Sequence, residues 1–324
     1  MAAWSPIISP AALARRLGDL GLRVVDVRWV LGGPGQGRAA YDSGHVPGAI
    51  FLDMDTDLVA SDGPGRHPLP SPADLRERLE AAGIGSDHSV VAYDDVGGWV
   101  AARLWWMLDD LGHDQVAVLD GGFPAWVAED LPVTRDLPAY VPARLELADR
   151  WTRTIDRAGV AAGLGRRVLL DARGGPRYRG ETEPIDPIPG HIPTARHAPV
   201  DGNLGPDGRV LGAAELADRF RGLGADGSQG TVVTSCGSGV AACFNSLAMR
   251  VAGLPDPLLY PGSYSDWSRA GLPIAVGPEP GQVPPDLEAA GGAATRTRST
   301  GRTGSAGRTG SAGRGAGGPT AADT

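Results

Sequence analysis

The chain contains no lysine: all 30 of its basic residues are arginine, and 38 acidic residues outnumber them. The formal net charge is −8, and the arginines form no basic cluster. This balance argues against nucleic acid and against an anionic membrane surface as main partners. No stretch approaches the roughly 20 apolar residues that a membrane-spanning helix needs. The first 13 residues lack the basic and apolar regions of a secretory signal.

Cysteine is also scarce, with only Cys236 and Cys243 in 324 residues. Two cysteines seven positions apart form neither a disulfide framework nor a C-x-x-C motif for metal or redox chemistry. A reducing, cytoplasmic location fits this usage. Cys243 falls within a predicted helix beside alanine and phenylalanine, a setting that favours core packing over chemistry.

Apolar periodicity stops near Gly277, and the remaining segment is rich in glycine, serine, alanine, threonine and arginine. Its GRTGSAG unit is followed at once by a near copy of itself. Such sequence cannot bury enough apolar surface to offset the conformational entropy lost on folding. We therefore predict a disordered low-complexity tail over residues 277–324.

The rest of the chain contains an internal repeat, because four landmarks recur in the same order at offsets of 141 to 146 residues. Matches of this regularity indicate a duplicated domain whose copies have diverged. The predicted boundaries are 5–135 for the first copy, 136–152 for a linker and 153–276 for the second copy. The paired landmarks are LRVVDVRW and RVLLDARG, GHVPGA and GHIPTA, VVAYDD and VVTSCG, and LDGGFPAW and YPGSYSDW.

Each copy alternates short apolar runs with helical patterns, which predicts an α/β fold with a parallel sheet and helices on both faces. Predicted strands cover 24–27, 90–93 and 116–119 in the first copy, and 168–171 and 231–235 in the second. Predicted helices cover 72–82, 98–111, 213–222 and 240–252.

Cys236 directly follows a predicted strand, at the carboxyl edge where parallel sheets bind ligands. Gly237 and Gly239 allow the backbone to curl so that several N–H groups face one point, and a helix begins near Val240. Both features favour a thiolate, the form in which cysteine acts as a nucleophile. A buried cysteine at a strand end is the plainer alternative. The first copy has Asp94 at the equivalent position and therefore no nucleophile.

The order DAR, GHIP, CGSGVAA and PGS-x-x-x-W, preceded by a copy without cysteine, resembles the tandem rhodanese-family sulfurtransferases over about residues 5–275. The resemblance implies two rhodanese-like domains and a persulfide intermediate on Cys236, with no metal and no organic cofactor. It also implies a small-molecule sulfur donor and an acceptor that is a thiol, cyanide or a thioredoxin-like carrier.

Within this family, the loop Cys236–Ala242 is similar to that of 3-mercaptopyruvate sulfurtransferases. Two basic residues in the loop accompany thiosulfate as the donor, and this loop has none. A thiosulfate dianion needs positive charge, whereas the hydroxyl of Ser238 suits proton handling for a thiol donor. We therefore expect 3-mercaptopyruvate as the donor, with thiosulfate as the alternative.

The resemblance also implies further site residues. Arg177 corresponds to the arginine that binds the substrate carboxylate, and Arg173 belongs to the DAR motif; Gly237, Gly239 and Val240 would line the substrate site. A proton relay would join Ser238 to His67 and Asp55 of the first copy. The second substrate arginine of some relatives has no counterpart in the stretch 182–186, which departs from the pattern of those relatives. His45 and His191 lie in similar turns and are predicted to be structural.

Two other classes of function remain open. A cysteine phosphatase would need an arginine six residues after the nucleophile, and that position is Ala242. A non-catalytic rhodanese-like module for binding or sulfur relay would not need an intact cysteine loop. The detection of a persulfide on Cys236 after donor treatment separates transfer chemistry from such a binding role.

Overall fold

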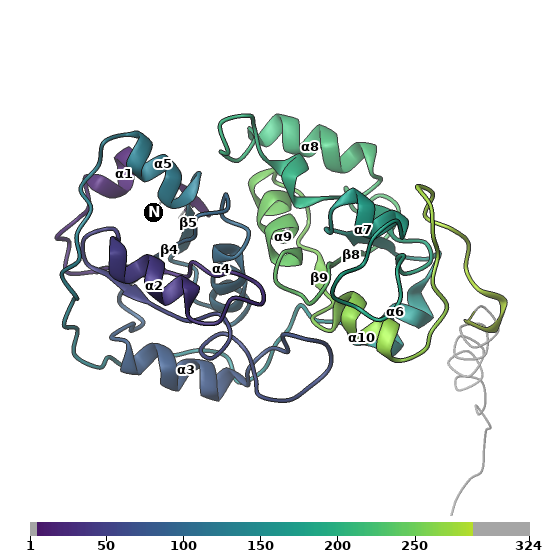
Figure 1. Cartoon of the computed structure of the whole chain (residues 1–324), viewed down its shortest axis with the longest axis horizontal. Coiled ribbons are helices and arrows are strands. Elements are labelled where there is room, and N and C mark those ends of the chain that lie inside the picture. Colours follow the sequence, from purple (N-terminus) through teal and green to yellow (C-terminus); the bar gives the residue numbers. More distant parts are fainter. Residues whose placement is uncertain (1–4, 288–324) are drawn as a thin grey trace, which may run out of the picture.

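Two parallel β-sheets, one in each half of the chain, organise the computed structural model, which describes residues 5–287 (Figure 1). All strand pairs within the two sheets are parallel. The first sheet has the order β1-β5-β4-β2-β3 and the second has the order β7-β6-β8-β9. The strands are β1 (Ile7–Ile8), β2 (Leu22–Asp26), β3 (Ala49–Phe51), β4 (Ser89–Tyr93), β5 (Val116–Leu119), β6 (Val168–Asp171), β7 (Arg196–His197), β8 (Val232–Ser235) and β9 (Leu258–Leu259).

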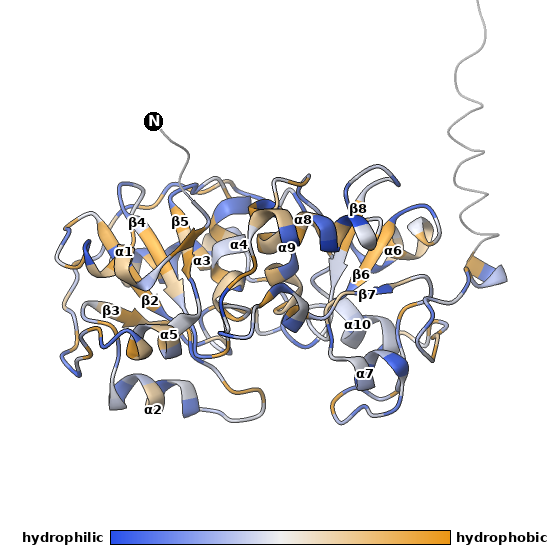
Figure 2. Ribbon diagram, turned by 90° about the horizontal axis from the view of Figure 1, so that it is seen from above, coloured by the Kyte–Doolittle hydropathy of each residue, from blue (hydrophilic) through white to orange (hydrophobic). Residues whose placement is uncertain are grey.

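Helices cover both faces of the first sheet, because alternate strand residues point to opposite sides. Val25 and Ala92 pack on one face with α3 (Pro72–Ala81) and α4 (Ala101–Asp110). Val24 and Val91 pack on the other face. The helices on that second face are α1 (Pro10–Ala14), α2 (Gln36–Ser43) and α5 (Gly122–Ala128). Figure 2 shows the apolar strands enclosed between these more polar outer layers.

The second sheet is enclosed in the same way. Leu169 and Val233 pack with α6 (Arg157–Gly163) and α10 (Ser263–Arg269). Val168 and Leu170 pack on the opposite face with α8 (Ala213–Gly222) and α9 (Ala242–Val251). The short helices α7 (Gly175–Arg179) and η1 (Val200–Asn203) follow β6 and β7. The prediction of two parallel sheets, each with helices on both faces, is confirmed.

The two domains share one apolar core where α4 of the first packs against α9 of the second. Trp105 and Leu108 lie in the same cluster as Cys236, Cys243 and Phe244. Both ribbon views place α4 and α9 side by side between the sheets (Figures 1 and 2). The first domain therefore forms one wall of the region around Cys236.

The predicted strands and helices are present, with shifts of up to three residues at their ends. The largest shifts occur after the glycine-containing turns that precede α4 and α9, since those turns delay each helix by two or three residues. The strands β1, β3, β7 and β9, of two or three residues each, were not predicted, because they are too short to show a period. Within residues 5–287, no helix is both long and apolar enough to span a membrane.

The predicted start of the disordered tail at Gly277 is wrong for residues 277–287. The carbonyl of Glu279 contacts Nε2 of His191 at 3.1 Å, and the carbonyl of Pro280 accepts a hydrogen bond from the Thr194 amide. Val283 and Leu287 pack against the core cluster beneath α6 and α10. This segment is therefore part of the second domain; the rest of the predicted tail lies outside the described residues.

Candidate active site

Cys236 lies between β8 and α9, at the base of a cavity of about 300 Å³ that both domains line. Its side chain is almost fully buried. The Gly239 amide donates a hydrogen bond to Cys236 Sγ at 3.1 Å, and the Cys236 amide donates to Ser263 Oγ. Gly239 has a φ of +78°, and a Cβ there would lie 2.5 Å from the carbonyl oxygen of Pro261. Only glycine therefore fits this turn and places its N–H toward the sulfur.

The predicted relay residues meet across the domain interface, although not as a complete triad. His67 Nδ1 lies 2.7 Å from Ser238 Oγ, a hydrogen-bond distance. The nearest His67–Asp55 approach, from Nε2 to Oδ1, is 3.8 Å, which is too long for a direct hydrogen bond. The other carboxylate oxygen of Asp55 accepts a hydrogen bond from Trp29 Nε1 at 2.9 Å. Ser238 and His67 thus form a pair, with Asp55 beyond hydrogen-bond reach.

His67 is held neutral at physiological pH. Burial lowers its pKa to about 4, and the positive charges of Arg66 and Arg103 lower it in the same direction. The ring stands edge-on to Trp29, with centroids 5.2 Å apart. A neutral imidazole can accept the Ser238 proton and return it, whereas an imidazolium could only donate.

Arg173, predicted to bind substrate, is held in place by several groups of the protein itself. Its guanidinium donates to both carboxylate oxygens of Asp171, to Glu183 and to the carbonyl of Gly190. The side chain is 2% exposed and stacks over the Tyr264 ring at 3.8 Å. It borders the cavity, and each of its three guanidinium nitrogens donates to at least one acceptor of the protein itself.

Arg177, the predicted carboxylate binder, faces the cavity together with Arg66, which the sequence did not point to. A Cβ added to Gly237 would lie 3.1 Å from Arg66 Nη2 and 3.4 Å from Arg177 Nη1. Within residues 5–287, neither of these two nitrogens has a hydrogen-bond partner. Arg66 belongs to the first domain and immediately precedes His67, the one signal that could have pointed to it. A second arginine therefore borders the cavity, and it comes from the other domain.

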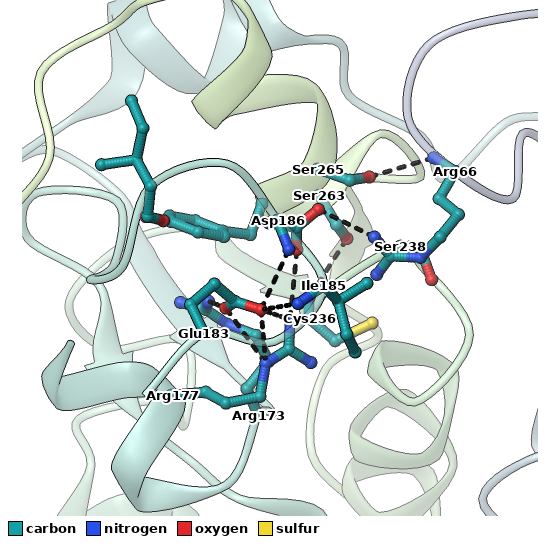
Figure 3. A network of polar contacts seen from close by, with 12 residues as sticks. Arg66, Arg173, Arg177, Glu183, Ile185, Asp186, Cys236, Ser238, Ser263 and Ser265 are labelled. Carbon is teal, nitrogen blue, oxygen red and sulfur yellow. Dashed lines mark hydrogen bonds and ion pairs between the residues drawn. The ribbon is translucent and has the colours of Figure 1, made fainter. Parts of the chain in front are cut away.

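Carboxylates balance these cations. Asp186 accepts from Arg66 Nη1 at 2.8 Å and from Arg177 Nη2 at 3.1 Å, so it ties the two arginines together (Figure 3). Glu183 accepts from Arg177 through both oxygens. Burial opposes ionisation of Glu183, but the hydrogen bonds from Arg177 and from backbone amides outweigh it and lower its pKa. The site therefore presents oriented N–H donors with little excess positive charge.

The remaining predicted residues have these positions. Gly237, Ser238 and Val240 line the cavity, and the amide of Gly239 donates a hydrogen bond to the Cys236 sulfur. Cys243 lies in the first turn of α9, where burial raises its pKa to about 12 and its thiol donates to the Gly239 carbonyl. His45 and His191 each stack on a tyrosine, and both ring nitrogens of each lie 2.8–3.2 Å from backbone carbonyl oxygens. Among residues 5–287, no cluster of side chains suits a metal ion.

Comparison with known proteins agrees with the duplicated architecture. The model of the rhodanese-like domain matches residues 9–129 and again residues 156–270. The chain belongs to the rhodanese-like family. It is 44% identical over 278 residues to a probable 3-mercaptopyruvate sulfurtransferase of Pseudomonas aeruginosa, covering 84% of this chain and 98% of that protein. It is 37% identical to the thiosulfate sulfurtransferase of Mus musculus, covering 80% and 89%.

The fold is also shared with solved structures. The 3-mercaptopyruvate sulfurtransferase of Leishmania major superposes with a TM-score of 0.71 at 32% identity, covering 82% of this chain and 74% of that one. These relatives are enzymes, and their names divide between two sulfur donors. Membership of the family is therefore settled by similarity, whereas the donor has to be argued from the site.

Proposed function

We propose that this protein is a sulfurtransferase that carries sulfur as a persulfide on Cys236. The observation that supports this most is the position of Cys236: a cysteine at the base of a two-domain cavity, with the Gly239 amide donating to its sulfur. An N–H donor at this place stabilises a sulfur anion, which is the form needed for nucleophilic attack. Within the described residues, Cys243 is the other thiol, and it is buried with a raised pKa.

The first half-reaction starts with the Cys236 thiolate. Its sulfur attacks the thiol sulfur of 3-mercaptopyruvate, a new S–S bond forms, and the carbon–sulfur bond of the donor breaks. The bonding electrons leave with the carbon as the enolate of pyruvate, which then takes a proton. Ser238, hydrogen-bonded to neutral His67, is placed to hand over that proton. In the second half-reaction, an acceptor thiolate or cyanide attacks the outer sulfur and restores the Cys236 thiolate.

The charge of the site favours 3-mercaptopyruvate over thiosulfate. Arg66 and Arg177 offer N–H donors suited to one carboxylate, but Glu183 and Asp186 offset their charge. A dianion such as thiosulfate gains less from a balanced site, and the loop itself adds no cation. Thiosulfate remains the second candidate, because two arginines above Gly237 are more positive charge than the loop sequence alone provides.

A donor panel tests this proposal. The kcat/KM values for 3-mercaptopyruvate and thiosulfate are measured with cyanide as the fixed acceptor. We expect the value for 3-mercaptopyruvate to be higher. A higher value for thiosulfate would assign the protein to the thiosulfate class and leave the persulfide mechanism intact.

The acceptor side of the proposal is a thiol, cyanide or a thioredoxin-like carrier. Two unpaired thiols support a reducing, cytoplasmic setting in which such acceptors occur. Mass spectrometry after donor treatment tests the non-catalytic alternative: we expect an added mass of one sulfur atom on the Cys236 peptide. A bare thiol after treatment with both donors would favour a binding module instead.

A further inference from the structure

Arg103 is a fully buried arginine that the proposed chemistry does not use. It belongs to α4 of the first domain and points across the interface toward the loop that carries Cys236. Its guanidinium donates to the carbonyl of Gly239 and to the carbonyl of His67, both at 3.0 Å. Its Nε atom has no hydrogen-bond partner, and none of the ion pairs within residues 5–287 includes it. A cation is thus buried beneath the site without a carboxylate.

The contact with Gly239 bears directly on the nucleophile. The amide of Gly239 is the N–H that donates to Cys236 Sγ, and its carbonyl accepts from both Arg103 and the Cys243 thiol. Gly239 therefore lies between a fixed guanidinium and the reactive sulfur. Loss of the Arg103 contact would leave the Gly239 carbonyl with only the weaker thiol donor of Cys243, so the peptide could turn and move its N–H away from Cys236.

The second contact holds the other half of the site. The carbonyl of His67 accepts from Arg103, and the imidazole of the same residue contacts Ser238 Oγ. One guanidinium thus connects the histidine of the first domain with the cysteine loop of the second. Because the guanidinium is planar and donates to both carbonyls, it constrains the distance between these two groups.

The charge of Arg103 also needs an anion. Arginine stays protonated in proteins, and burying it without a counter-charge is costly. Cys243 remains a neutral thiol because its pKa is raised to about 12. Arg66 and Arg177 face the cavity from the other side and are already paired with carboxylates, and His67 is neutral. Cys243 and Cys236 are the two acidic side chains that interact with Arg103, and Cys236 is the one whose sulfur accepts the Gly239 amide at the cavity.

We propose that Arg103 is a positioning residue that holds Gly239 and His67 in register around Cys236 and supplies the buried counter-charge for its sulfur anion. The inference deepens the sulfurtransferase function proposed above and rests on it for the persulfide step. It assigns to the domain without a nucleophile a direct influence on the nucleophile of the other domain.

The test compares Arg103→Met, Arg103→Lys and a control, Arg23→Met, in the full-length chain. Arg23 is a buried arginine of the same domain that donates to the carbonyls of Gly83, Leu20 and Leu22, away from the cavity. The rate of Cys236 alkylation by iodoacetamide is followed against pH by peptide mass spectrometry. We expect Arg103→Met to raise the pH midpoint by about one unit, a tenfold change in the thiolate equilibrium. In Arg103→Lys the pH midpoint should lie close to the wild-type value, because the positive charge is kept. In Arg23→Met the midpoint should not change.

Labelling of Cys243 in the same samples reports unfolding, since this buried thiol reacts only when the core opens. If Arg103→Met unfolds, Arg103→Lys becomes the test variant. Lysine keeps the positive charge but cannot donate to both carbonyls as the planar guanidinium does. We then expect a wild-type pH midpoint for alkylation and a lower kcat for sulfur transfer. A folded Arg103→Met protein with the wild-type midpoint and kcat would overturn the inference, as would a wild-type kcat in Arg103→Lys if Arg103→Met unfolds. Alkylation needs no sulfur donor, so failure of the proposed sulfurtransferase activity would be seen separately.

Discussion

The loop that follows the central strand has a different hydrogen-bonding pattern in each domain. In the first domain, the Asp94 carboxylate accepts four backbone hydrogen bonds, from the amides of Val96, Gly98, Val100 and Ala101. In the second domain, Cys236 occupies the equivalent position, and its sulfur accepts from the Gly239 amide. Within the described residues, the amides of Ser238 and Val240 have no acceptor. In the first domain the carboxyl group of Asp94 occupies the loop amides, whereas in the second domain amides of the loop stay available as donors.

The comparison separates structural residues from functional ones. Asp26 and Arg28 of the first domain form the same buried ion pair as Asp171 and Arg173 of the second. Each arginine also donates to the carbonyl of the glycine that precedes a stacked histidine. A feature present in both copies serves the fold. A feature present in one copy, such as Cys236, is a candidate for chemistry.

The largest effect should come from changing the occupant of the open loop. Cys236→Ala should abolish sulfur transfer, because it removes the nucleophile. Cys236→Asp should also abolish it, but with a melting temperature at least as high as that of Cys236→Ala, since the carboxylate can accept the loop amides as Asp94 does. Turnover with 3-mercaptopyruvate and thermal unfolding provide the two measurements.

Cys243→Ala is the matched control, because it removes the other buried thiol without touching the nucleophile. We expect it to retain most activity. Measurable transfer by Cys236→Ala would contradict the mechanism, and an inactive but folded Cys243→Ala protein would mean that the two cysteines cooperate.

Arginines at the cavity should affect substrate binding, whereas arginines of the ion pair found in both domains should affect stability. Arg177→Ala and Arg66→Ala should each raise KM for 3-mercaptopyruvate about 10- to 100-fold, because a charge-assisted hydrogen bond is worth roughly 1.5–3 kcal/mol. Arg28→Ala, which removes the ion pair of the first domain, should lower stability and leave KM unchanged. Steady-state kinetics beside denaturant unfolding separates the two classes. An unchanged KM in Arg66→Ala would remove this residue from the donor site.

The loop around Asp94 in the first domain should contribute to the stability of the fold rather than to the rate of the reaction. Asp94→Ala leaves four buried amides without their acceptor and should lower the free energy of unfolding by roughly 3 kcal/mol or more. Asp95→Ala changes the exposed neighbour and should cost far less. Urea denaturation of both variants gives the difference, and equal losses would show that the cradle around Asp94 does not stabilise the fold.

His67 gives the first domain a pH dependence of its own. Its pKa in the folded state is about 4, against about 6.5 when unfolded, so the unfolded chain binds the proton more tightly between these values. Stability should therefore fall as the pH drops from about 6.5 to about 4, by up to about 3 kcal/mol from this residue. In His67→Asn the fall should be smaller by that amount. Unfolding at pH 7.5 and pH 4.5 checks this, and identical falls would exclude His67 as the source.

The sequence alone was sufficient to predict the repeated domains and the local structure around Cys236. The duplicated landmarks predicted both sheets, and the strand–glycine–helix pattern pointed to the Cys236 loop. Contacts between residues far apart in the chain were harder to predict. Arg66 and Arg103 meet the second domain only after folding, and no spacing in the sequence indicates either contact. The sequence also could not show that Arg173 both borders the cavity and forms a buried ion pair with Asp171, because its partners are fixed only by the fold.

The smallest effect concerns the end of the second domain. The first domain has an isolated bridge between His45 and Thr134, and the second has the matching bridge between His191 and Ala275. The second domain then adds residues 277–287, with backbone contacts to His191 and Thr194 and with Val283 on the core. A chain that ends at Val276 should therefore melt a few degrees lower than one that ends at Leu287, since about 1 kcal/mol shifts the midpoint by roughly 2–4 °C in a chain of this size. Both should keep the wild-type KM, because the segment contributes no residue to the cavity. Equal melting temperatures would show that these contacts add nothing and that the domain ends, as its partner does, just after the bridge.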